Sequence, residues 1–107
     1  MKFRKTLSIS FFVLFLNCVM GYSIAHADEA LAKSKNCLAC HGVDNKLVGP
    51  SLKDISAKYK GDGAAADNLF TKIKAGGGGV WGDIPMPPNA AVSDDEIKTL
   101  VSWILSL

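Results

Sequence analysis

The chain has 107 residues, of which 49% are apolar and 21% charged, and its formal net charge is +2. A chain of this length holds one small domain, which excludes multidomain enzymes and the large dinucleotide-binding and barrel scaffolds. The near balance of charge does not indicate a nucleic-acid-binding protein. Cysteine and histidine are scarce, with three and two residues, so their positions carry more information than their number.

The first 27 residues have the three-part pattern of a secretory signal peptide. Three basic residues within the first five positions precede an apolar stretch from Leu7 to Met20. The segment ends in Ala25-His26-Ala27, with small residues at its first and third places. We therefore predict cleavage after Ala27 and export of a mature domain, residues 28–107, to the periplasm.

Two alternatives to this cleavage are less well supported. A membrane anchor needs about 20 mostly apolar residues, whereas the strongest apolar run, Phe11–Leu16, has six residues. A lipoprotein anchored at Cys18 is disfavoured by the bulky Asn17 before it.

Cleavage leaves 80 residues in which nine lysines face ten acidic residues, for a net charge of −1. It also leaves two cysteines, one histidine and one methionine.

Short helices are predicted along the mature chain. The first covers Asp28–Lys35, where acidic residues in the first turn suit the helix dipole. The second covers Pro50–Lys60, with Pro50 in its first turn, where a missing amide hydrogen is tolerated. The third covers Ala64–Ala75 and ends at a run of four glycines.

The C-terminal part of the chain combines a stiff loop with an amphipathic helix. Three prolines in Val80–Val92 exclude a helix there and favour extended backbone. Ser93-Asp94-Asp95-Glu96 then has the pattern of a capping box. Apolar residues follow it at helical spacing, at Ile97, Leu100, Val101, Ile104 and Leu107. The overall prediction is an all-α domain of four or five short helices joined by Gly- and Pro-rich loops.

The motif Cys37-Leu38-Ala39-Cys40-His41 carries the most specific chemistry in the chain. Cys-x-x-Cys-His is the attachment signature of c-type haem. Each thiol adds to one haem vinyl group, and the following His41 is placed to bind the iron. An 80-residue domain needs such support, because its apolar core is small. We expect one covalently attached haem c.

Three other uses of these cysteines are less well supported. A disulfide between Cys37 and Cys40 would close too small a loop to stabilise the fold much. A thioredoxin-type redox pair needs a βαβ setting that the sequence lacks. A structural zinc ion takes four ligands, and the mature chain offers two cysteines and one histidine.

The second axial position of the iron has a candidate in Met86. No other histidine remains in the mature chain, which leaves Met86, a lysine or open coordination. Met86 lies between Pro85 and Pro87, and prolines reduce the entropy lost when a loop is held in place. The ordinary use of a single methionine is to fill a core. A His/Met pair is typical of electron-carrying cytochromes c and raises the reduction potential.

At this point the chain resembles the small bacterial class I cytochromes c of the c-551/c-552 type. The resemblance covers nearly all of residues 28–107. Its matching segments are Cys37–His41, Val48–Pro50, Gly79–Gly82, Ile84–Asn89 and Val92–Glu96. It implies the class I cytochrome c fold, with crossed N- and C-terminal helices and haem enclosed between the helices and the methionine loop.

The resemblance implies roles for three further residues. The Pro50 carbonyl would accept a hydrogen bond from His41 and raise the donor strength of the imidazole. Trp81 would donate its indole N–H to a haem propionate, and Asn89 would lie near the Met86 sulfur. The segment from Asn89 to the last helix is one alanine longer than the usual pattern of the family.

The leading functional hypothesis is a soluble, monomeric periplasmic electron carrier that is not an enzyme. Its iron would alternate between Fe(III) and Fe(II) with both axial positions filled. The resemblance implies redox partners such as a nitrite reductase, a terminal oxidase or a quinol-oxidising complex. Two other hypotheses are a haem-based gas sensor or small haem enzyme with a labile Met86, and a detached subunit of a larger dehydrogenase.

Charge is unevenly distributed along the mature chain. Residues 33–74 carry eight lysines against four acidic residues, and the remainder carries six acidic residues against Lys98. Opposed regions of +4 and −5 would orient an encounter with a redox partner. The alternative is an ordinary solvated surface, because sequence segments are not surface faces.

Overall fold

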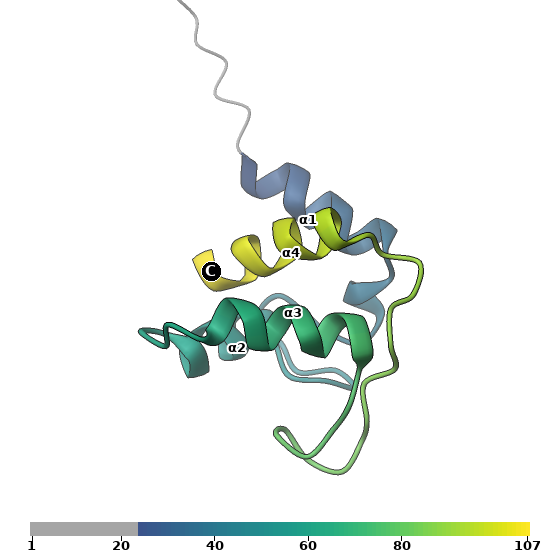
Figure 1. The fold of residues 1–107 in the computed structure, drawn as a ribbon, viewed down its shortest axis with the longest axis vertical. Helices are drawn as coiled ribbons and strands as arrows, with labels where there is room; N and C mark the ends of the chain where they lie inside the picture. Colours follow the sequence, from purple (N-terminus) through teal and green to yellow (C-terminus); the bar gives the residue numbers. More distant parts are fainter. Residues whose placement is uncertain (1–23) are drawn as a thin grey trace, which may run out of the picture.

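The computed structural model describes residues 24–107, so the predicted signal peptide lies outside the described residues except for its last four positions. This part of the chain forms α1 (Ile24–Ser34), the 3-10 turn η1 (Cys37–Ala39), α2 (Leu52–Tyr59), α3 (Ala65–Ala75) and α4 (Asp94–Ser106) (Figure 1). It contains no strand, only two isolated β-bridges. The all-α prediction is therefore confirmed. Within residues 24–107, none of the helices has the length and apolar character needed to cross a bilayer.

The start of α2 differs from the sequence prediction. Pro50 precedes the helix instead of occupying its first turn, and Ser51 is the N-cap. The Ser51 hydroxyl accepts a hydrogen bond from the amide of Asp54 at 3.1 Å, which satisfies one of the free amides of the first turn. The Pro50 carbonyl consequently lies outside the helix ladder and is available to another group.

The capping box at the start of α4 is confirmed. The Ser93 hydroxyl accepts a hydrogen bond from the Glu96 amide at 3.2 Å, and the Glu96 carboxylate accepts one from the Ser93 amide at 3.1 Å. Val92 and Ile97, which flank the box at the positions of a hydrophobic staple, are both buried. These contacts set the residue at which the loop ends and α4 begins.

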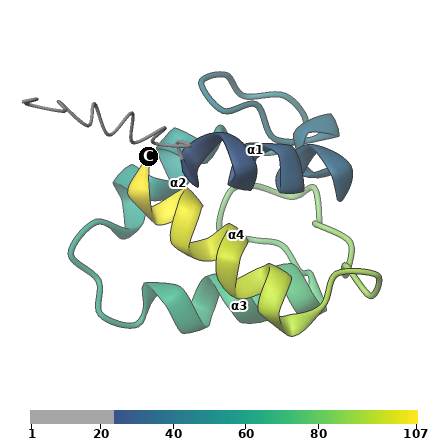
Figure 2. The same cartoon turned by 90° about the horizontal axis from the view of Figure 1, so that it is seen from above.

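The core is built around α4, which contacts α1, α2 and α3. In Figure 1, α4 lies between α1 and α3, and Figure 2 shows it running at an angle across α1. Its apolar positions predicted from helical spacing are buried, and Ile97 is 0% exposed. Leu107 is the exception, with 37% exposure, because the helix ends one residue earlier and the chain end faces solvent.

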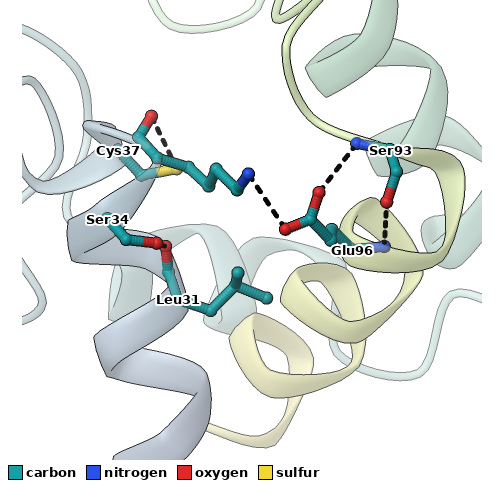
Figure 3. A network of polar contacts seen from close by, with 6 residues as sticks. Leu31, Ser34, Cys37, Ser93 and Glu96 are labelled. Carbon is teal, nitrogen blue, oxygen red and sulfur yellow. Dashed lines mark hydrogen bonds and ion pairs between the residues drawn. The ribbon is translucent and has the colours of Figure 1, made fainter.

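An ion pair joins the end of α1 to the start of α4. The ammonium of Lys35 lies 3.0 Å from the Glu96 carboxylate, whose other oxygen is held by Ser93 (Figure 3). On the α1 side, the Ser34 hydroxyl donates to the Leu31 carbonyl at 2.8 Å, in the last turn of the helix (Figure 3). This network holds the segment before the cysteine motif against the capping box.

Candidate functional site

A cavity lies between the helices and two long loops, residues 40–51 and residues 76–93, the second of which is the methionine loop. Its wall contains the four side chains predicted to bind the haem directly. These are Cys37, Cys40, His41 and Met86. The cavity holds about 1150 Å³ of empty space, counting its open mouth. The helices contribute an apolar wall that includes Ala32, Leu52, Ile55, Ile73, Leu100 and Trp103.

The cysteine motif is wound into one tight turn. The amides of Cys40 and His41 both donate to the Cys37 carbonyl, at 3.2 and 2.9 Å. Asn36, just before the turn, has a left-handed backbone with φ of 62°. Within the described residues neither cysteine is in a disulfide, and Cys37 is half-buried while Cys40 is exposed. Before haem is attached, burial raises the pKa of the Cys37 thiol, and a backbone hydrogen bond opposes this shift.

The His41 imidazole is oriented by the backbone of the next loop. Its Nδ1 lies 2.8 Å from the Pro50 carbonyl. Because a carbonyl oxygen only accepts, Nδ1 carries the hydrogen and Nε2 keeps its lone pair for a metal. The imidazole also packs on the backbone of Gly49, where a Cβ would lie 2.6 Å from the ring Cε1. A side chain at this glycine would therefore displace the ring.

Met86 is presented from the opposite loop by a pair of backbone hydrogen bonds. Its amide donates to the Gly77 carbonyl at 2.8 Å, and the Gly77 amide donates to the Met86 carbonyl at 2.9 Å. The Met86 side chain is half-buried against the helical core. This site can therefore offer two thiols, an imidazole and a thioether to one group in an apolar cavity.

The match to known proteins decides the family. The sequence model of one protein family, described as Cytochrome c, matches residues 28–107. The chain belongs to the cytochrome c family. It is 53% identical over 103 residues to cytochrome c-552 of Nitrosomonas europaea, covering 96% of this chain and 98% of that protein. It is 55% identical over 82 residues to cytochrome c-551 of Pseudomonas aeruginosa, covering 77% of this chain and 78% of that protein.

Solved structures agree with the fold. The crystal structure of wild-type Nitrosomonas europaea cytochrome c552 matches with a TM-score of 0.72 at 58% identity, covering 74% of this chain and 98% of that one. The class 1 cytochrome MtoD of Sideroxydans lithotrophicus matches with a TM-score of 0.65 at 36% identity, covering 76% and 92%. The protein therefore has the class I cytochrome c fold, carries one covalently bound haem c and transfers electrons. The apolar cavity and its sulfur and imidazole donors fit that group.

Trp81 and Asn89 were expected to contact the haem and the Met86 sulfur. Trp81 lines the cavity, is 44% exposed and lies under the ammonium of Lys58, which is 5.5 Å from the ring centroid. The Asn89 side-chain amide donates to the carbonyls of Ile73 and Pro87, at 2.9 and 3.4 Å. Neither of these Asn89 hydrogen bonds goes to the Met86 sulfur. The bond to Ile73 ties the methionine loop to the last turn of α3, and the bond to Pro87 lies within the loop.

The segment after Asn89, which the sequence suggested is one alanine longer than the family pattern, forms a turn. The Val92 amide donates to the Asn89 carbonyl at 3.2 Å, which closes the turn over Ala90 and Ala91. The Asn89 backbone amide itself donates to the Ile73 carbonyl at 3.2 Å. The loop is therefore attached to α3 just before this turn.

Sequence reasoning missed two contributors to the cavity. Lys72 is the only lysine or carboxylate among the lining residues in the described part of the chain. Lys72 lies three residues after Leu69 and next to Ile73, so it is on the inward face of α3. Helical periodicity could therefore have predicted its position. The role of Gly49 could not be predicted in this way, because it depends on the ring of His41, which only the folded chain brings against Gly49.

Proposed function

We propose that residues 28–107 act as a monomeric periplasmic electron carrier after removal of residues 1–27. The three-part pattern of the N-terminus supports export. The family match also begins at residue 28, directly after the predicted cleavage site. N-terminal sequencing of the exported protein tests this proposal. A start at Asp28 supports it, and a start at Met1 or Cys18 contradicts it.

In this proposal Cys37 and Cys40 would form thioethers with the haem, and His41 and Met86 would hold its iron. Bound haem supplies an iron that alternates between Fe(III) and Fe(II). The observation that carries the proposal is the common cavity, because it brings Met86 to the same space as a histidine 45 residues earlier. The free Nε2 of His41, with Nδ1 engaged by Pro50, supports the histidine half of this ligand pair.

The proposed ligand pair explains why the protein carries electrons instead of acting on a substrate. With both His41 and Met86 as ligands, the protein itself would fill the positions on the iron that a small molecule would need. The prolines beside Met86 and the backbone hydrogen bonds between Gly77 and Met86 restrict the loop. If the ligands His41 and Met86 keep their positions, the structural change that accompanies electron transfer is small.

We assign supporting roles to Trp81 and Asn89. Trp81 lies in the cavity wall and is 44% exposed, a position suited to donating the indole N–H to a haem propionate. Asn89 acts through the backbone, since its hydrogen bonds to Ile73 hold the methionine loop on α3. Trp81→Phe, which keeps the ring and removes the N–H, should change the pH dependence of the reduction potential.

The mouth of the cavity is the proposed surface for redox partners. Four of the residues that line the cavity are apolar and exposed: Val48, Val80, Trp81 and Ile84. Lys58 lies over the Trp81 ring and Lys72 lines the wall, so cations accompany this apolar surface. Such a surface suits an acidic partner, for which a nitrite reductase, a terminal oxidase and a quinol-oxidising complex are the candidates.

The uneven charge of the sequence is partly neutralised by the fold. Lys35 and Lys74, from the basic segment, pair with Glu96 and Asp94 at the start of α4. Lys53 pairs with Asp44 within the basic segment. The docking proposal therefore depends on the cations at the cavity mouth. Electron transfer to an acidic partner should slow as salt rises, and a rate independent of salt would contradict electrostatic steering.

The decisive experiment for the ligand pair uses oxidised and reduced holoprotein. We expect the far-red absorption band of a methionine–iron bond in the oxidised protein at neutral pH, and slow, incomplete binding of carbon monoxide by the reduced protein. Met86→Leu keeps an apolar side chain of similar size but removes the sulfur. It should abolish the band and bind carbon monoxide rapidly. Survival of the band in Met86→Leu, or rapid stoichiometric binding by the wild type, would contradict the proposal.

A further inference from the structure

The end of α3 lies against the backbone of the methionine loop at a single glycine, Gly76. This residue is the C-cap of α3, and its amide donates to the Lys72 carbonyl at 2.8 Å. Its φ of 72° and ψ of −161° form a backbone conformation that residues with a side chain rarely adopt. The chain turns here from the helix into the segment that pairs with Met86.

The space beside Gly76 is filled by the backbone of the loop. A Cβ added to Gly76 would collide with the Met86 carbonyl oxygen. It would also lie 2.8 Å from the nitrogen of Pro88 and 2.9 Å from the carbonyl carbon of Pro87. These are backbone atoms in a proline segment, so rotation of a side chain cannot relieve the contact. The loop would have to move as a unit.

The next residue couples this contact to Met86. Gly77 exchanges both backbone hydrogen bonds with Met86, at 2.8 and 2.9 Å. We call Gly76 and Gly77 together the glycine clamp. A displacement of the loop at Gly76 stretches both of these hydrogen bonds and shifts the backbone from which the Met86 side chain extends.

We propose that Gly76 is a positioning residue for Met86: its lack of a side chain sets how closely the methionine loop approaches α3, and so how firmly the sulfur holds the haem iron. This inference rests on the proposed ligation by Met86. It assigns the strength of that ligation to a residue that does not touch the iron. A side chain at Gly76 should loosen Met86 while leaving His41, on the opposite loop, in place.

The chain offers a matched control in Gly61. Gly61 also has a positive φ, of 81°, but a Cβ there would meet nothing within 4 Å. Gly61→Ala therefore places a methyl group on another glycine of positive φ without any contact to the methionine loop. A difference between Gly76→Ala and Gly61→Ala shows an effect that a positive φ alone does not produce.

The test measures binding of added imidazole to the oxidised holoprotein, because imidazole competes with a loosened methionine. Gly76→Ala should weaken the far-red band and tighten imidazole binding by about tenfold or more, whereas Gly61→Ala should change neither. In a Met86→Ala background, adding Gly76→Ala should have no further effect, since no sulfur remains to be displaced. Equal imidazole affinities of Gly76→Ala and Gly61→Ala would overturn the inference.

A second measurement uses the wild type, so it does not depend on folding of the variant. Amide hydrogen exchange of Gly77 and Met86 should be slow in both oxidation states if the glycine clamp holds the loop. Exchange at the rate of open loop amides would also overturn the inference. The two measurements distinguish failure of this inference from failure of the proposed ligation. A wild type without the far-red band would contradict ligation by Met86, whereas hydrogen exchange tests the glycine clamp whether or not Met86 binds iron.

Discussion

Replacing Ser93 by alanine tests how the start of α4 is held. The change removes the hydroxyl that accepts the Glu96 amide at 3.2 Å, but it leaves the reciprocal bond from the Ser93 backbone amide to the Glu96 carboxylate. One of the two hydrogen bonds of the capping box is therefore lost. Val92 and Ile97 stay buried on either side and keep the loop entering the helix at the same place.

The expected cost follows from these contacts. Loss of an N-cap hydroxyl costs about 0.5–2 kcal/mol, and about 1 kcal/mol is expected here because Ser93 is exposed and water replaces part of the bond. In a domain of this size, 1 kcal/mol corresponds to a fall of about 4–8 °C in the unfolding midpoint.

The assay is thermal and guanidinium unfolding of the oxidised holoprotein, followed by helical circular dichroism and by haem absorption. Ser102→Ala is the matched control, because Ser102 is exposed within the same helix and away from its cap. We expect Ser102→Ala to be neutral or slightly stabilising, since alanine favours helix. The reasoning is refuted if Ser93→Ala loses no more stability than Ser102→Ala.

Three further predictions concern the Glu96 carboxylate, the contact between Gly49 and His41, and the core residue Ile97. The Ser93 amide and the Lys35 ammonium hold the pKa of Glu96 below its ordinary value, so the carboxylate stabilises the fold above its unfolded-state pKa. That contribution is lost as pH falls through the lower folded-state pKa, and Glu96→Gln should remove this acidic dependence from guanidinium midpoints; an unchanged dependence argues against it. Gly49→Ala should cost about 1–3 kcal/mol of holoprotein stability by displacing the imidazole of His41, and a neutral effect would contradict the packing. Ile97→Ala should cost about 2–5 kcal/mol by thermal unfolding, and a loss under 1 kcal/mol would place that side chain outside the core.

Much of the site could be predicted from the sequence because its parts are local. Cys37 and His41 belong to one five-residue motif, and a single tight turn is enough to put them on one wall. The capping box at Ser93 uses neighbours three residues apart, so the pattern already contains its geometry. The proline loop around Met86 excludes a helix through the ring constraint of each proline.

Other features required contacts between distant segments. Pro50 looks like a first-turn proline, yet Ser51 caps the helix and the Pro50 carbonyl turns to His41. Asn89 reaches Ile73 on α3, which no local pattern indicates. Leu107 follows the apolar spacing of α4 but is exposed, because periodicity does not say where a helix ends.

By itself, the sequence determines the helices, the haem motif and the proline loop, since propensity, capping and spacing act over a few residues. Only the tertiary structure decides how closely the two loops approach the helices. The glycines show the reason. Gly49 and Gly76 are ordinary loop residues in the sequence, but in the fold each lies where a Cβ would strike the imidazole of His41 or the backbone of Met86. Close packing between distant segments assigns those roles, and one carbon atom is enough to disturb them.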